Sequence, residues 1–100
     1  MTAYVISEVE VLDQEAADDY KRLAVASIAM FGGRYLARGA VPEVVEGTST
    51  NRQIVLVEFP TLERAHEWYA SPTYTQALCV RERALERRLL FVEGLAQPAV

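Results

Sequence analysis

Apolar and polar residues alternate with a period of two in four parts of the chain, which is the pattern of half-buried β-strands. The four segments are Ala3–Leu12, "RYLAR" at 34–38, "QIVLVEF" at 53–59 and "LLFVEG" at 89–94. The third segment is the most apolar, and β-branched residues are frequent in the first. We therefore predict four strands.

The segment between the first two strands has its apolar residues at helical spacing instead. "QEAADDYKRLAVASIAMF" at 14–31 places Tyr20 and Ser27 on one stripe, which predicts an amphipathic helix. Asp13 is a suitable N-cap, because its carboxylate can accept from the free amides of the first turn. Gly32 and Gly33 end the helix, since glycine readily adopts the left-handed conformation that is common after a helix C-terminus.

Two shorter helices are expected between the third and fourth strands. Pro60 and Thr61 end the third strand and begin one helix, and Ser71 and Pro72 begin the next, which we predict to extend to about Arg87. The predicted inner face of the first of these helices comprises Leu62, Ala65, His66 and Tyr69.

The resulting order is β-α-β-β-α-β with the second helix broken in two, which predicts an α+β, ferredoxin-like fold: a four-stranded antiparallel sheet with helices on one face. At 100 residues the chain has room for one core. We predict a single domain over residues 1–95 and a C-terminal tail over 96–100. A turn or bend is expected at Gly39–Pro42, and "EVVEGTSTNRQ" at 43–53 is expected to hold a short hairpin extension before a loop at Gly47–Arg52.

Strand alternation divides the sheet's side chains between two faces. The face expected under the helices comprises Val5, Ser7, Val9, Val11, Tyr35, Ala37, Val55, Val57, Phe59, Leu90 and Val92. The opposite face comprises Tyr4, Ile6, Glu8, Glu10, Arg34, Leu36, Arg38, Ile54, Leu56, Glu58, Leu89, Phe91 and Glu93.

The opposite face is too apolar for water and too charged for a dry core, which favours a second copy of the sheet packed against it. The alternative is a monomer with a patchy sheet surface. The predicted homodimer interface includes Glu8, Glu10, Leu36, Arg38, Leu56, Phe91 and Glu93.

The stretch "GGRYLARGA" at 32–40 raises the question of what two arginines do on one strand. Alternation turns both Arg34 and Arg38 away from the helices, toward the four glutamates of the opposite face. Arg38 is interpreted as an interface charge. Arg34 has two interpretations, an interface ion pair or a group that holds an anion in a pocket.

Composition narrows the function without naming it. The net charge of −4 and the absence of a basic stripe argue against nucleic acid as a partner. The chain shows no signal peptide and no apolar run long enough to span a membrane. Its one cysteine, Cys79, is typical of a protein from a reducing compartment, and we expect it to be an inert, buried thiol. We expect a cytoplasmic protein with no nucleic-acid or membrane partner.

Candidate chemistry is sparse. His66 is the only histidine, so no histidine-based metal cluster can form, and no nucleotide or other cofactor motif is present. His66 has the pKa range of a general base, although a histidine packed at a helix–sheet edge is the favoured interpretation. Arg81 interrupts an apolar stripe and needs either an anion or a path for its head to water. Ser71 and Tyr74 carry hydroxyls near the helix break, which capping and core packing also explain.

Several of these motifs together are similar to one family. "GGRYLARGA", "VVEG", "IVLVEFPTLERAHEWYASPTY" and the later Arg81 resemble the domain of unknown function 1330 family, of the dimeric α/β-barrel superfamily. The resemblance runs over nearly the whole chain and implies the same fold and a homodimer. It carries over a candidate ligand-binding set of Arg34, Glu58, Trp68, Ser71, Tyr74 and Arg81, whereas His66 lies outside the family motif.

The resemblance implies no single activity, because relatives include cofactor-independent oxygenases, isomerases, cyclases, haem-dependent enzymes and binding proteins. The favoured hypothesis is a small homodimer that binds an anionic or carbonyl-bearing organic molecule between sheet and helices, with Arg34 or Arg81 holding the negative end and no cofactor. Catalysis, if any, would fall to His66, Tyr74 or Glu58 in a cofactor-free isomerase, cyclase or oxygenase reaction. The rival is a non-enzymatic structural or stress-related dimer without a ligand pocket.

Overall fold

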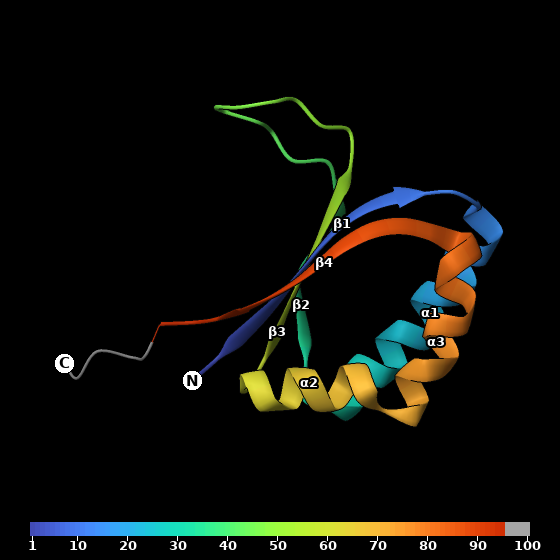
Figure 1. Ribbon diagram of the computed structural model, residues 1–100, viewed down its shortest axis with the longest axis vertical. Coiled ribbons are helices and arrows are strands. Elements are labelled where there is room, and N and C mark those ends of the chain that lie inside the picture. Colours follow the sequence, from blue (N-terminus) through green and yellow to red (C-terminus); the bar gives the residue numbers. More distant parts are fainter. Residues whose placement is uncertain (96–100) are drawn as a thin grey trace.

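The computed structural model describes residues 1–95, and the predicted tail at 96–100 lies outside them. The elements are β1 (Ala3–Val11), α1 (Gln14–Met30), β2 (Arg34–Ala40), β3 (Gln53–Phe59), α2 (Leu62–Ala70), α3 (Pro72–Ala84) and β4 (Leu85–Glu93). The strands form one antiparallel sheet in the order β2-β3-β1-β4. The three helices lie together on one side of this sheet (Figure 1), which confirms the predicted ferredoxin-like architecture.

The predicted helix starts are found where their caps require them. The Asp13 side chain accepts from the amide of Ala16 at 3.0 Å, and Thr61 caps α2 in the same way. Gly32 takes the left-handed conformation after α1, with φ of +77°. Gly33 has an ordinary φ but no room for a side chain, because an added Cβ would lie 2.6 Å from Ile28 Cγ2.

The predicted boundary between α3 and β4 is wrong. The helix ends at Ala84 and the strand begins at the next residue, Leu85, with no loop between them. The run "RERALERR" has the charge spacing of a helix surface, which hid this junction from the sequence. Arg87 is therefore a strand residue opposite Val9 of β1, not the last residue of a helix.

The longer β4 also exchanges the predicted faces of its side chains. Val5 and Ser7, which face the helices, are opposite Phe91 and Leu89. Leu89 and Phe91 therefore lie under the helices and pack against the core. Leu90 and Val92 take the uncovered face instead. Glu93 is opposite the buried Ala3 and lies on the face toward the helices. The prediction that Phe91 and Glu93 belong to the uncovered face is therefore wrong.

Two register shifts in β2 correct the interpretation of Arg38. The pairing passes from Tyr35 opposite Val57 to Ala37 opposite Leu56, which leaves Leu36 as an extra residue. Ala37 consequently faces away from the helices, and Arg38, opposite Val55, faces toward them. A second shift at Gly39, where φ is +83°, follows directly. Strict alternation predicted the reverse for both Ala37 and Arg38, because a bulge leaves no mark in a period-two pattern.

An aromatic cluster fills the space between α2, α3 and the sheet. Trp68, Tyr74 and Phe59 are almost completely buried, and the ring centroids of Trp68 and Tyr74 are 4.1 Å apart. Tyr69 and His66, predicted on the inner face of α2, are exposed at its edge, while Trp68 takes the buried position. The exposed position of Cys79 likewise corrects the expectation of a buried thiol.

The connection between β2 and β3 projects from the body of the molecule as a long arm (Figure 1). Residues 41–52 contain no helix or strand, so the predicted hairpin extension is absent. Val45 in this arm is 86 % exposed.

Candidate functional site

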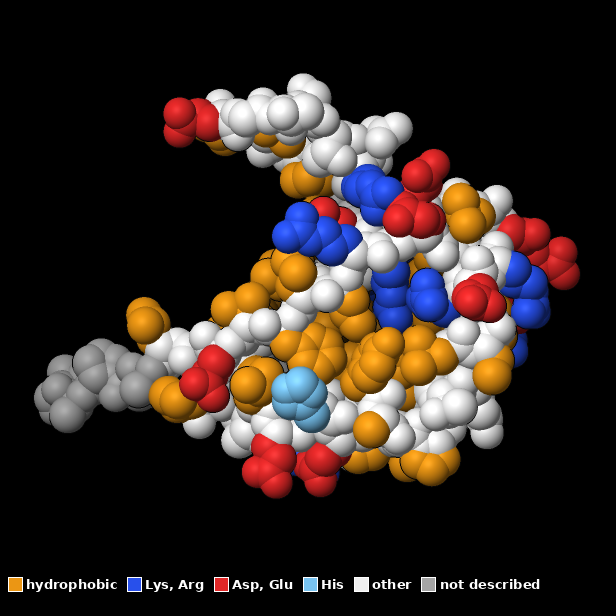
Figure 2. All heavy atoms as spheres, in the orientation of Figure 1, with side chains coloured by type: hydrophobic (Ala, Val, Ile, Leu, Met, Phe, Trp, Pro, Cys, Tyr) orange, Lys and Arg blue, Asp and Glu red, His pale blue; other side chains and the backbone are white. Residues whose placement is uncertain are grey.

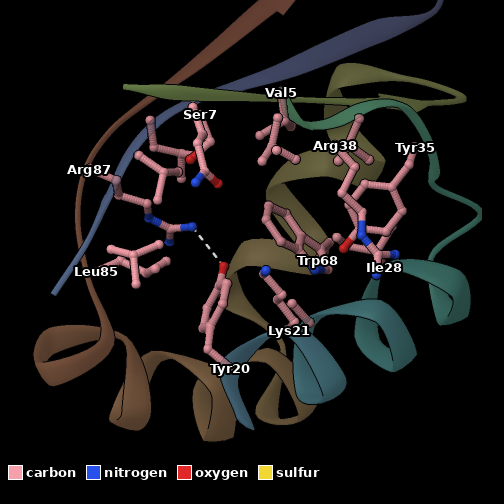
Figure 3. Close-up of a pocket in the computed structure, with 18 residues that line it drawn as sticks. Val5, Ser7, Tyr20, Lys21, Ile28, Tyr35, Arg38, Trp68, Leu85 and Arg87 are labelled. Carbon is pink, nitrogen blue, oxygen red and sulfur yellow. Dashed lines mark hydrogen bonds between the residues drawn. The ribbon is translucent and has the colours of Figure 1, made fainter. Parts of the chain in front are cut away.

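A cavity of about 110 Å³ lies between the helices and the covered face of the sheet. This volume is several times what one water molecule needs, so it has room for a small organic molecule. Figure 3 shows β-strand residues on one side of the cavity and α1 residues on the other. Its apolar wall comprises Val5, Val9, Val11, Ala24, Ile28, Val55, Val57, Trp68, Leu85 and Leu89.

The inner end of the cavity holds a cation without a carboxylate. Arg87 Nη1 donates to the Tyr20 hydroxyl at 2.7 Å, and Arg87 Nη2 donates to the Tyr74 hydroxyl at 2.8 Å. Both acceptors are neutral oxygens. In the part of the chain that the structure describes, Arg87 forms no salt bridge. A largely buried guanidinium in this state is expected to attract an anion.

The protonation states of this group follow from burial and from the contacts. Burial raises the pKa of the Tyr74 hydroxyl above its ordinary value, and the adjacent Tyr20 raises it further. Burial opposes the charge of Arg87, yet Tyr20 and Tyr74 outweigh that effect and the pKa of Arg87 lies above its usual range. At neutral pH Arg87 is therefore charged and the Tyr74 hydroxyl keeps its proton.

Counting protons shows what this group offers to a ligand. The hydroxyls of Tyr20 and Tyr74 are hydrogen-bonded to each other, and either one can be the donor. Because Arg87 donates to both oxygens, only one of the two hydroxyl protons is used between them. Tyr20 lines the cavity and Tyr74 does not. When Tyr74 donates to Tyr20, the Tyr20 hydroxyl keeps a proton that it can donate into the cavity.

Ser7 adds a second free hydroxyl on the same wall. Its Oγ is buried and has no hydrogen-bond partner among the described residues. Ser7 is two residues from Val9 on β1, and Val9 is opposite Arg87, so Ser7 and Arg87 are diagonal neighbours on the same face. A buried hydroxyl without a partner is costly, and a ligand oxygen in the cavity would satisfy it.

The mouth of the cavity is also basic. Of the lining residues, the two that are exposed are Lys21 of α1 and Arg38 of β2. The Arg38 guanidinium lies 4.9 Å from the centre of the Tyr35 ring, and burial raises the pKa of the Tyr35 hydroxyl to about 12. Neither cation forms a salt bridge within residues 1–95, and no aspartate or glutamate of this region lines the cavity.

Of the six ligand-binding residues predicted from the sequence, the structure brings two to this region. Trp68 lines the cavity, and its indole donates to Ser27 Oγ at 3.1 Å. Tyr74 does not line the cavity, but its hydroxyl accepts from Arg87. Ser71 caps α3 by accepting from the Tyr74 amide, and its hydroxyl donates to the Trp68 carbonyl at 2.7 Å. Ser71 therefore holds the helix break in place and does not line the cavity.

The other three predicted residues lie elsewhere. Arg34 and Glu58 are opposite each other on the uncovered face, where Arg34 Nε donates to Glu58 Oε1 at 2.7 Å. This contact is an ion pair between two neighbouring strands of one subunit. Arg81 is half-buried on α3 and does not line the cavity. A role for these three in ligand binding stays a prediction.

His66, the other catalytic candidate, is exposed on α2 with its ring 5.1 Å from the ring of Phe91. The space-filling view shows it beside the hydrophobic side chains that gather between sheet and helices (Figure 2). A catalytic role for His66 stays a prediction. Among residues 1–95, no group of three or more histidine, cysteine, aspartate or glutamate side chains is placed to hold a metal ion.

Sequence reasoning missed Arg87, Tyr20 and Ser7 as site residues. The sequence pattern places Tyr20 on the inner stripe of α1 and Ser7 on the covered face of the sheet, and it gives neither residue a further role. The sequence does hold a signal for Arg87. At strand spacing it is the one charged residue in an otherwise apolar row, Leu85, Arg87, Leu89 and Phe91. Its position in an otherwise apolar row marks a charge that points under the helices.

The sheet face away from the helices has no cover in the described chain. Apolar residues that are half-buried or exposed gather there, beside the Arg34–Glu58 pair. They are Tyr4, Ile6, Ile54, Leu56, Leu90 and Val92. None of the helices in residues 1–95 has the length and hydropathy needed to cross a bilayer.

A family model for a domain of unknown function, DUF1330, matches residues 2–95, and the chain belongs to this family. No curated protein gives a significant match. The RPA0582 protein of unknown function from Rhodopseudomonas palustris is similar in structure, with a TM-score of 0.76, 18 % identity, and coverage of 96 % of this chain and 84 % of that one.

Two further solved structures share the fold. SnoaB, a cofactor-independent oxygenase from Streptomyces nogalater, aligns with a TM-score of 0.67 and 8 % identity over 96 % of this chain and 95 % of its own. A dimeric protein of unknown function with a ferredoxin-like fold from Bacteroides fragilis has a TM-score of 0.62 and 16 % identity, over 93 % of this chain and 96 % of its own. At these identities the likeness establishes the fold alone.

Proposed function

We propose that this member of the DUF1330 family binds a small organic anion with an apolar body in the cavity between sheet and helices. The observation that carries the proposal is Arg87, a largely buried cation whose hydrogen-bond partners within residues 1–95 are two tyrosine hydroxyls. The ligand's carboxylate or enolate oxygen would accept from Arg87, from the free Tyr20 proton and from Ser7. Its apolar body would contact Trp68 and the valines of β1 and β3.

The charge pattern supports an anion over a neutral ligand. The chain carries a net charge of −4, yet the charged residues that line the cavity are Lys21, Arg38 and Arg87. The arginines at 22, 34, 52 and 64 pair with carboxylates, whereas the three cavity cations do not. Arg81, Arg83 and Arg88 also form no salt bridge among the described residues, but they lie outside the cavity, so the three cations that line it are free to pair with a ligand's anion.

The reaction class that fits such a cavity is one that needs proton donors and a negative charge held in place. A cofactor-free isomerase, cyclase or oxygenase step through an enolate-like species has these needs, because hydrogen-bond donors stabilise the developing negative oxygen. Likeness to the SnoaB fold is compatible with this class. Tyr74, one of the predicted catalytic candidates, would act through Tyr20 by orienting its proton, which makes it a positioning residue.

We also propose that the uncovered sheet face pairs two copies of the chain. The support is the row of apolar side chains there, and a dimeric solved structure shares the fold. Glu8, Glu10 and Leu56 of the predicted interface lie on this face. Sedimentation should give twice the mass of one chain, and Leu56→Arg should give the mass of one. A wild-type monomer at micromolar concentration would overturn the dimer.

The cavity proposal is tested by titration of the protein with hexanoate. Trp68 is the only tryptophan of the chain and lines the cavity, so its fluorescence reports occupancy directly. We expect hexanoate to change this fluorescence, and Arg87→Gln to weaken binding at least about tenfold because a charge-assisted hydrogen bond is lost. Arg81→Gln is the matched control and should bind as the wild type does.

The outcome also decides between the two candidate functions. If hexanoate and a panel of aromatic and branched carboxylates leave the Trp68 fluorescence unchanged, the binding proposal fails. That result would favour the alternative function, a purely structural dimer. If Arg81→Gln or Arg34→Gln weakens binding and Arg87→Gln does not, the anion sits where the sequence alone placed it.

A further inference from the structure

The cations of the cavity are separated into two groups. Arg87 belongs to β4 and Arg38 to β2, and these are the two edge strands of the sheet. Three strand spacings of roughly 4.8 Å separate the backbones of such strands. Figure 3 shows Arg87 with Tyr20 at one end of the cavity and Arg38 with Tyr35 at the other, with Val5 and Trp68 between them.

The strand wall between the two groups and the Ile28 and Trp68 side chains facing it are apolar, and the Lys21 side chain enters from α1 between Tyr20 and Trp68 (Figure 3). Val5, Val55 and Val57 of the central strands form this wall. An acidic group held against these apolar side chains would lose water without gaining a partner from them. A ligand that fits both ends must therefore carry its polar groups at its two ends and an apolar segment between them.

The two ends differ in burial. Arg87 is fixed by two tyrosine hydroxyls and has the buried Ser7 hydroxyl on the same face, so it forms a rigid inner end. Arg38 and Lys21 are exposed at the mouth, from opposite walls, and each has a long flexible stem. The outer end can therefore adapt to ligand length, within the reach of these two side chains.

We propose, resting on the function proposed above, that the natural ligand is a dianion: an apolar body with one acidic group bound by Arg87 and a second held at the mouth by Arg38 and Lys21. A monoanion would use only the inner end and leave the two cations at the mouth without a partner. The second acidic group would gain less than the first, because the mouth is exposed to water and salt.

The experiment compares α,ω-dicarboxylates from butanedioate to octanedioate, each with the monocarboxylate of the same chain length, by calorimetry on the full chain. We expect dicarboxylates to bind about five- to tenfold more tightly at one optimal length, since partly exposed ion pairs contribute modestly. Arg38→Gln and Lys21→Gln should each reduce this advantage and leave monocarboxylate affinity within about twofold. Arg34→Gln and Arg22→Gln are matched controls, because these arginines lie outside the cavity and already pair with Glu58 and Asp19.

The outcomes separate this inference from the proposal on which it rests. If monocarboxylates bind through Arg87 but no dicarboxylate binds more tightly at any length, the dianion is wrong and the anion site stands. If Arg38→Gln weakens both kinds of acid equally, the mouth attracts anions generally and the second contact is wrong. If neither kind of acid binds, both proposals fall.

Discussion

Arg87 of β4 donates to the Tyr20 hydroxyl of α1 at 2.7 Å, and no carboxylate among the described residues pairs with its charge. A cation kept in this state costs stability, because neutral oxygens replace only part of its hydration. A charged group held without a counter-ion in a cavity wall is typical of a binding site.

This view predicts that Arg87 contributes little to folding. We expect Arg87→Met to change the free energy of unfolding by less than about 1 kcal/mol, because the lost hydrogen bonds are offset by relief from a buried unpaired charge. Urea denaturation measures this directly. Trp68→Ala, which empties a core position, is the reference and should cost about 3–5 kcal/mol. A loss of 3 kcal/mol or more in Arg87→Met would make Arg87 a structural residue.

The two tyrosines at Arg87 should separate into different roles. Tyr74→Phe removes a fully buried hydroxyl and leaves Arg87 Nη2 without its acceptor, so we expect a stability loss of about 1–3 kcal/mol. Tyr20→Phe removes the proton that faces the cavity, so it should weaken hexanoate binding more than Tyr74→Phe does. Paired denaturation and calorimetry on the two variants check this. Equal loss of affinity in both would contradict the proton assignment.

Alkaline pH should destabilise the protein through its buried tyrosines. Burial raises the pKa of Tyr35 to about 12 and raises that of Tyr74 as well, so the folded state holds these protons more tightly than the unfolded chain. Their contribution to stability is complete below an unfolded pKa of about 10 and is lost as pH rises from there through the folded pKa. Denaturation between pH 8 and pH 11 should show this fall, and Tyr35→Phe should make it shallower. A stability that rises over this range would contradict the burial of these hydroxyls.

The bulge at Gly39 should matter for both stability and binding. Its φ of +83° is strained for any residue with a Cβ, so Gly39→Ala should cost about 1 kcal/mol. Gly47, in the arm between β2 and β3, has a φ of +108° and open space around it. Gly47→Ala is therefore the matched control. Both should lose similar stability, but only Gly39→Ala should disturb Arg38 and weaken dicarboxylate binding. A loss of dicarboxylate affinity in Gly47→Ala would implicate the arm.

Most of the fold could be predicted from periodicity, and the reasons for the errors are specific. β1, β3 and α1 have long regular patterns with caps such as Asp13, so their ends were found within one or two residues. The α3–β4 junction has no breaker residue, since Ala84 and Leu85 suit either state. A helix that ends without glycine or proline gives no local signal of its end.

The site was harder to predict because it depends on register. A one-residue change of register exchanges the faces of a whole strand, and both β4 and the bulged half of β2 were affected. This is why the sequence placed Arg38 on the uncovered face and passed over Arg87. Trp68 and Tyr74 were found because they belong to the family motif, which needs no register. Arg34, the open question of "GGRYLARGA", pairs with Glu58, and Arg38 of the same stretch reaches the cavity.

The central claim is that Arg87 holds a negative charge, and the most direct test is the affinity of hexanoate relative to hexanamide. The two share an apolar body and differ in charge, so their ratio isolates the electrostatic contribution. We predict that the wild type prefers hexanoate by at least about tenfold and that Arg87→Gln shows almost no preference. Equal affinity for the two in the wild type, or a preference that survives in Arg87→Gln, would contradict the account.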